Sequence, residues 1–182
     1  MITLMIGERI KRIRTFRGIT QKELGLKIGY DEKSADVRIA QYESNYRVPK
    51  KDTILQIAEA LDINYVAISA NDSGSAEDIM QTLFWLDEQN DAVLNLFEFK
   101  PASKTNGTFD TNEYNIASPL IGITIEYGLV NDFLHEWMKR KTELKNGEIS
   151  RNEYFEWKIN WPRTCDDCGN VEPLKNWRSE PL

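Results

Sequence analysis

The chain has 182 residues, two cysteines and a formal net charge of −6. No apolar run is long enough to span a bilayer, and the short apolar start at residues 1–6 leads into a basic helix, so neither a membrane anchor nor a signal peptide is expected. The two cysteines do not suggest a secreted disulfide framework, and a soluble cytoplasmic protein is therefore expected.

The charge is divided unevenly along the chain. Residues 1–70 contain 12 Lys and Arg against 9 Asp and Glu, a net charge of +3, whereas residues 71–182 contain 11 against 20, a net charge of −9. A basic first part and an acidic remainder suggest two units with different tasks, although the total charge taken alone argues against a nucleic-acid partner.

The first two helices are expected within the basic part. Ile6, Ile10 and Ile13 recur at helical spacing, and Gly18 is suited to end that helix because glycine readily adopts the left-handed conformation. A second helix is predicted over residues 21–28, because a threonine followed by a glutamate three positions later is typical of a capping box.

Three more helices complete the basic part. A helix from about residue 34 or 36 to residue 44 would bury Ile39 and Tyr42. Two others are expected over residues 51–61 and 65–69, the first of them shortly after a proline. Residues 1–70 are therefore predicted to form one compact, five-helix domain.

The acidic part is predicted to form a separate unit with a small domain. Residues 71–76 are small and polar and are expected to be a linker, residues 77–162 a C-terminal domain, and residues 163–182 an irregular tail. The elements expected in the domain are a helix, a strand and two further helices, over residues 77–90, 92–99, 118–147 and 151–160. The fold class is thus mainly α, with a small α+β or mostly helical C-terminal domain.

Residues 6–69 contain a linked set of motifs. The segments "GERIKRIRTFRGITQKELGLKIG", "RIAQYESNYRVP" and "ILQIAEALDIN" follow one another in order. This arrangement resembles the lambda-repressor/Cro-like family of helix-turn-helix regulators, also called the XRE type. The resemblance implies a five-helix lambda-repressor-like domain that binds double-stranded DNA, with the second helix of the motif in the major groove.

The resemblance also implies which residues meet DNA. Arg38 suits guanine and Gln41 suits adenine, and each such contact is worth about 1–3 kcal/mol of discrimination. Gln21 begins its helix and is expected to hold a phosphate. The full set implied for DNA binding is Gln21, Lys33, Ser34, Asp36, Val37, Arg38, Gln41, Ser44, Asn45, Arg47 and Lys50. Glu43 corresponds to a structural acid of the family and is expected to pair with Arg14.

The segment before the third helix departs from the family pattern. At the family's usual spacing, the buried apolar residue would be Ala35, whereas in this sequence it is Ile39, so "YDEKSADV" contains an inserted stretch. The insertion places Asp31, Glu32 and Asp36 near the expected DNA face, where phosphates repel acidic groups. The positions assigned to Asp36, Val37 and Arg38 therefore depend on where the helix begins.

The function expected is that of a sequence-specific transcriptional regulator, a repressor that binds a two-fold operator as a homodimer. The acidic part resembles the C-terminal region of some Gram-positive members of the family, and its aromatic residues favour a small core over a dimer interface or a small-molecule or protein effector site. The alternative is an antitoxin-like interaction module, whose acidic part binds a partner protein. No cofactor is expected.

Signals for an enzyme are weak. His135 lacks the second histidine of a zinc-protease helix, and the adjacent Ser103 and Lys104 show no self-cleavage site, so the protein is not expected to be an enzyme. Cys165 and Cys168 supply half of the ligands of a tetrahedral zinc site. A reduced, unliganded pair is favoured over a zinc ion shared between two chains.

Overall fold

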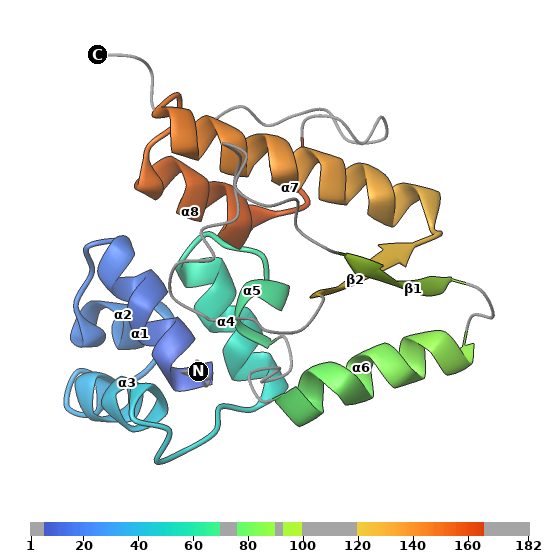
Figure 1. The fold of residues 1–182 in the computed structure, drawn as a ribbon. Coiled ribbons are helices and arrows are strands. Elements are labelled where there is room, and N and C mark those ends of the chain that lie inside the picture. Colours follow the sequence, from blue (N-terminus) through green and yellow to red (C-terminus); the bar gives the residue numbers. More distant parts are fainter. Residues whose placement is uncertain (1–5, 70–75, 90–92, 100–119, 166–182) are drawn as a thin grey trace.

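The computed structural model describes residues 6–69, 76–89, 93–99 and 120–165, and in these ranges the chain forms eight helices and one antiparallel pair of strands. Helices α1 to α5 gather around one core, α7 and α8 form a pair beside it, and α6 and the strands extend away from it (Figure 1). The elements are α1 (Ile6–Phe16), α2 (Gln21–Lys27), α3 (Ala35–Glu43), α4 (Lys51–Ala60), α5 (Val66–Ser69), α6 (Ala76–Gln89), β1 (Leu94–Phe99), β2 (Leu120–Ile125), α7 (Gly128–Asn146) and α8 (Arg151–Asn160).

The five predicted N-terminal helices are present, and their ends follow local chemistry. Thr20 and Glu23 form a complete capping box at the start of α2. Gly18 and Gly29 have φ values of 69° and 87°, so both end a helix in the left-handed conformation that glycine adopts without strain. None of the helices in the described ranges is long and apolar enough to cross a membrane.

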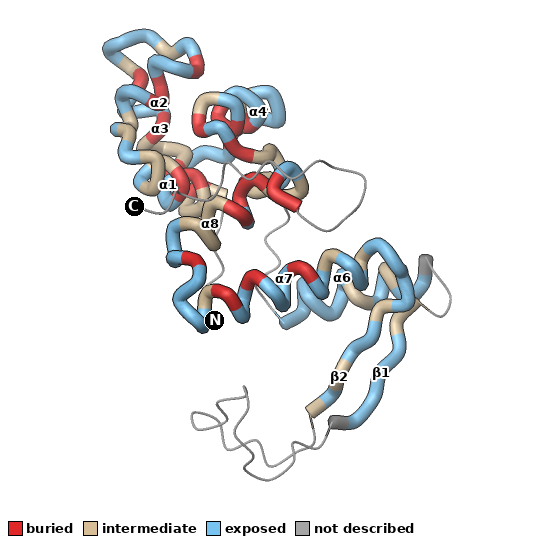
Figure 2. Tube along the Cα trace, turned by 90° about the horizontal axis from the view of Figure 1, so that it is seen from above, coloured by how far each residue is buried: buried red, intermediate tan, exposed pale blue. Residues whose placement is uncertain are grey.

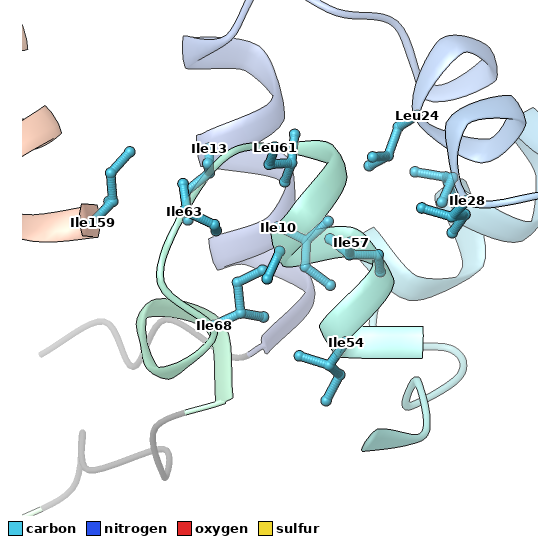
Figure 3. Packing of buried hydrophobic residues seen from close by; sticks show 12 residues of the cluster. Ile10, Ile13, Leu24, Ile28, Ile54, Ile57, Leu61, Ile63, Ile68 and Ile159 are labelled. Atoms are coloured by element: carbon cyan, nitrogen blue, oxygen red, sulfur yellow. The ribbon is translucent and has the colours of Figure 1, made fainter. Parts of the chain in front are cut away.

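A cluster of buried isoleucine and leucine side chains holds these helices together (Figure 3). Ile10, Leu24 and Ile57 are completely buried where α1, α2 and α4 meet. Ile159 belongs to α8 and yet lies in the same cluster, only 4% exposed. The last helix in the described residues, α8, therefore contributes to the core of the first domain. Burial of a whole isoleucine side chain is worth roughly 1.5–3 kcal/mol.

The helix predicted over residues 118–147 is wrong in its first part. Residues 120–125 form β2, which pairs antiparallel with β1, and the helix begins only at Gly128. Ile121, Ile123 and Ile125 alternate with other residues, a period-two pattern of β-branched side chains that favours a strand. At Gly122 the ring of Phe97 on β1 lies so close that an added Cβ would collide with it. Glycine at this position therefore suits a close strand pair.

Helices α7 and α8 are joined through buried polar groups. Arg140 is 1% exposed and donates to Glu143 at 2.9 Å, and Trp157 of α8 donates through Nε1 to Glu136 of α7 at 3.0 Å. Ser150 and Glu153 form the predicted capping box at the start of α8. Of these contacts, the bond from Trp157 to Glu136 crosses between the helices and holds α8 against α7.

The two cysteines require a correction. Cys165 is fully buried and disulfide-bonded, whereas a reduced pair in an irregular tail was expected. It lies at the end of a turn that packs against α7, because its amide donates to the Pro162 carbonyl and its sulfur lies beside Glu136. No group of three or more potential metal ligands occurs in the described part of the chain. Cys168, Ser103 with Lys104, and residues 71–75 of the predicted linker lie outside the described residues. Ala76, the last residue of the predicted linker, is instead the first residue of α6.

The described residues between α6 and the first half of α7 form no buried core. No side chain described between residues 76 and 135 is buried, as the pale blue and tan colours of these elements show (Figure 2). Large apolar side chains are exposed on each element, among them Trp85 on α6 at 62%, Leu96 on β1 at 71% and Ile121 on β2 at 59%. We call the described residues of this segment, 76–89, 93–99 and 120–135, the open arm.

Candidate nucleic-acid interface

Helix α3 is held tightly against α2. Ala35 and Ile39 are both completely buried, one turn apart on the same face of α3. A Cβ added to Gly25 of α2 would lie 2.5 Å from the Ala35 carbonyl oxygen and 2.7 Å from its Cβ. Only glycine permits this approach of the two helices. Ala35, where the family spacing places the buried residue, is the first residue of α3, and the next buried position is Ile39.

A buried carboxylate links the three helices of the motif. Glu43 of α3 accepts from Arg14 of α1 at 2.6 Å and 3.1 Å, and from the Gln21 side chain of α2 at 2.7 Å. Arg14 also donates to the Ile19 carbonyl at 2.7 Å. The predicted ion pair between Arg14 and Glu43 is thus present and joins α1 to α3, while the hydrogen bond from Gln21 joins α2 to α3. Gln21, assigned to a phosphate, has its side-chain amide directed to Glu43 instead.

The outward face of α3 carries the predicted base-reading residues. Asp36, Val37 and Arg38 are exposed, Val37 at 52%, and Gln41 is half-buried. Arg38 and Gln41 are three residues apart on a helix, so their side chains are neighbours on one face. The structure therefore brings a guanidinium and an amide together where an outside partner can reach them.

The inserted acidic stretch forms a turn that leads into α3. The amides of Ser34 and Ala35 both donate to the Asp31 carbonyl at 2.9 Å. Glu32 pairs with Lys22 of α2 at 2.9 Å, and this hydrogen bond lowers the pKa of Glu32 and raises the pKa of Lys22. Of the three acids Asp31, Glu32 and Asp36, Glu32 is therefore neutralised within the domain, which reduces the repulsion that a phosphate would meet.

Tyr30 supports Arg38 from behind, a role that the sequence analysis did not identify. Its hydroxyl lies 2.9 Å from the hydroxyl of Tyr42, and the Arg38 guanidinium lies over its ring, 5.0 Å from the centroid. Burial raises the pKa of Tyr30, with a further contribution from the bond to Tyr42. The ring is thus fixed on one side and restricts the orientations that Arg38 can take. The pairing of residues 30 and 42 depends on the path of the inserted turn, which no sequence motif specifies.

Of the remaining residues predicted to contact DNA, some form hydrogen bonds within the domain and others are exposed cations. Asn45 adopts a left-handed conformation with φ of 58°, and its Oδ1 accepts the Gly7 amide at 2.9 Å, so its side chain holds the start of α1. The Ser44 hydroxyl donates to the Gln41 carbonyl at 3.3 Å, and Ser34 is half-buried before α3. Lys33, Arg47 and Lys50 are exposed and lie before and after α3. These three cations, like Arg38, can be reached by an external anion.

The N-terminal part of the chain also matches a known family in sequence. Residues 7–71 match the model of a helix-turn-helix domain family. A search of curated proteins finds no match. The solved structures that match include one described as "transcriptional regulator BswR", at 30% sequence identity and a TM-score of 0.35, and the match covers 47% of this chain and 95% of that chain. The chain therefore belongs to the helix-turn-helix family through its N-terminal domain.

Proposed function

We propose that this protein is a sequence-specific DNA-binding regulator of transcription, in which α3 enters the major groove. The observation that supports this most directly is the exposed pair Arg38 and Gln41 on a helix whose other face is locked by Ile39 and Glu43. A rigid helix that presents a guanidinium and an amide can make bidentate contacts with guanine and adenine. The positive net charge of residues 1–70 favours the approach to phosphates.

Selection of bound DNA from a random pool, followed by affinity measurements, tests this proposal. Arg38→Ala and Gln41→Ala should each reduce discrimination at one base position by about 1–3 kcal/mol. Lys50→Gln, on the exposed start of α4, should weaken all sequences equally and reduce the salt slope by about 1. Enrichment of the same sequences by wild type and both α3 variants would refute the assignment of α3 to the groove.

We further propose that the regulator is a homodimer joined through the open arm. One helix-turn-helix module reads one half-site, and a two-fold operator needs two of them. The open arm consists of α6, the paired strands β1 and β2, and the first half of α7. None of its described side chains is buried. A two-stranded sheet without such support is at best marginally stable in water. A second copy of the same surface would cover the exposed tryptophan and isoleucine side chains of both chains at once.

Sedimentation of the full chain tests the dimer. Wild type is expected to sediment as a dimer, and Leu96→Asp or Ile123→Asp should convert it to a monomer, because both side chains project from one face of the hairpin. Val66→Asp is the matched control, since Val66 is 59% exposed but belongs to α5. A monomeric wild type, or a dimer that survives both hairpin variants, would contradict this interface. Monomers that capture a different protein would support the interaction-module alternative instead.

Repression is the mode of action that we propose, because a dimer bound across a promoter blocks transcription without any additional contact. A reporter placed behind the selected operator should be silenced by wild type and restored by Arg38→Ala. Increased expression with wild type would show activation instead.

A further inference from the structure

A basic pocket lies on the side of α1 that faces away from α3. Its volume is about 550 Å³, within the range of roughly 300–1,000 Å³ that is common for small-molecule sites. Arg12 of α1 lines it together with Lys145 of α7 and with Arg151 and Lys158 of α8. No acidic residue is among its lining residues, although the C-terminal part of the chain is strongly acidic.

The pocket is distinct from the candidate DNA-binding face. Arg12 and Arg14 are two residues apart on α1 and so point to nearly opposite sides of the helix. Arg14 pairs with Glu43 of α3, whereas the Arg12 guanidinium lies over the ring of Phe155 of α8, 4.8 Å from its centroid. Both overall views place α8 across α1 from α3 (Figures 1 and 2).

The four cations are brought together without compensating acids. None of them forms an ion pair with a residue in the described ranges. Lys158 and Arg12 approach the same Phe155 ring, at 5.9 Å and 4.8 Å from its centroid. Burial lowers the pKa of Lys158, and the charge of Arg12 lowers it further. The negative charge of an anion placed between these cations would favour the charged form of Lys158 and offset its repulsion by Arg12.

The other walls of the pocket are apolar or aromatic. Leu144 and Ile149 line it from the end of α7 and the following turn, and Tyr154 and Phe155 line it from α8. Phe155 is fixed by an edge-to-face contact with Phe16, with ring centroids 4.9 Å apart. Aromatic walls beside cations suit a ligand that has both a flat apolar body and a negative group.

We propose that this pocket binds a small organic anion, one that carries a phosphate or carboxylate group on an apolar or aromatic body. The charged group lies between Arg12, Arg151 and Lys158, and the apolar body lies against Tyr154 and Phe155. Because Arg12 belongs to the helix-turn-helix domain and the other residues to the α7–α8 pair, the bound anion connects the two. The binding step itself does not depend on the proposed DNA-binding function.

Titration calorimetry of the DNA-free, full-length protein tests this site, with phenyl phosphate as the probe of a phosphate group and benzoate as the probe of a carboxylate. At least one of the two should bind with one site per chain, and phenol and inorganic phosphate should bind more weakly, because each lacks one half of the expected ligand. Lys158→Gln and Arg151→Gln should each weaken binding about tenfold or more, since a hydrogen bond to a charged group is lost.

Two variants serve as controls for this titration. Lys141→Gln removes an equal charge from α7 outside the pocket, and Arg38→Gln removes one from the candidate DNA-binding face, so both should bind the probe as wild type does. Absence of binding by both probes, or an equal loss in Lys158→Gln and Lys141→Gln, would overturn the proposal. Phenol binding as tightly as phenyl phosphate would show an apolar site and would overturn it as well. A failure to bind DNA would leave these outcomes unchanged.

Discussion

Replacement of the buried carboxylate of Glu43 by an amide should destabilise the protein strongly. In Glu43→Gln the shape of the side chain is retained, but Arg14 loses its countercharge, and an NH2 group faces donors where an oxygen accepted them. Breaking a buried ion pair in this way typically costs about 3–5 kcal/mol. The side chain of Arg14 is 13% exposed and keeps its bond to the Ile19 carbonyl, so a loss near the lower end, about 3 kcal/mol, is expected.

Urea unfolding provides the measurement. With a slope of about 2 kcal/mol per molar, a loss of about 3 kcal/mol lowers the midpoint by about 1.5 M. Glu32→Gln is the matched control, because Glu32 pairs with Lys22 in a fully solvent-exposed position and its loss should hardly move the midpoint. Equal shifts in the two variants would refute the view that Glu43 locks the motif.

A double variant tests whether Arg14 and Glu43 stabilise the domain as a pair. In Arg14→Met with Glu43→Leu no buried charge is left unpaired, so this protein should be more stable than the sum of the two single changes implies. Strict additivity of the single effects would mean that the two side chains stabilise the domain independently of each other.

Three further predictions concern local features. Gly25→Ala should destabilise the protein by about 1–3 kcal/mol in urea unfolding, because the added Cβ would lie 2.5 Å from a backbone oxygen of α3; a variant as stable as wild type would contradict the close crossing of α2 and α3. Burial and the charge of Arg12 lower the pKa of Lys158, so the unfolded chain binds more protons than the folded chain between that lowered pKa and 10.5. The stability measured by thermal unfolding should therefore rise with pH across this window, and Lys158→Met should remove the rise. The hydrogen bond with the Thr20 backbone lowers the pKa of Glu23. The Glu23 carboxylate therefore stabilises the protein fully above pH 4.5, and this stabilisation is lost as the pH falls through the lowered pKa. Glu23→Gln should melt at a lower temperature than wild type at neutral pH and at the same temperature in strong acid.

Local signals in the sequence were sufficient for much of the first domain. The capping residues and the spacing of Ile10, Ile13 and Leu24 each specify a structure within a few residues, so the five helices could be predicted. The same holds for α8, whose capping box lies at Ser150 and Glu153. The outward position of Arg38 on α3 followed from the family motif and the burial of Ile39.

Features that depend on distant pairing could not be predicted in this way. Strand β2 was expected to be part of a helix, because a short apolar run is ambiguous until its partner strand is known. The contact of Arg38 with Tyr30 depends on an inserted turn, and the basic pocket depends on where α8 meets α1. A sequence signal for that pocket existed, since Lys145, Arg151 and Lys158 lie close together within an otherwise acidic region.

Because Ile159 of α8 lies in the core of the N-terminal domain, residues 1–70 do not contain the whole of that core. The Asn64 amide donates to the Ile159 carbonyl at 3.0 Å. The Arg17 guanidinium donates two hydrogen bonds to the Glu156 carboxylate, at 2.6 Å and 2.8 Å, and a third to the Leu61 carbonyl. A chimera joined at residue 70 would keep the bond from Arg17 to Leu61 but lose the contacts with Ile159 and Glu156, and it would expose the neighbouring apolar side chains. Grafting this DNA-binding specificity onto another protein therefore requires transfer of α8 along with α1 to α5.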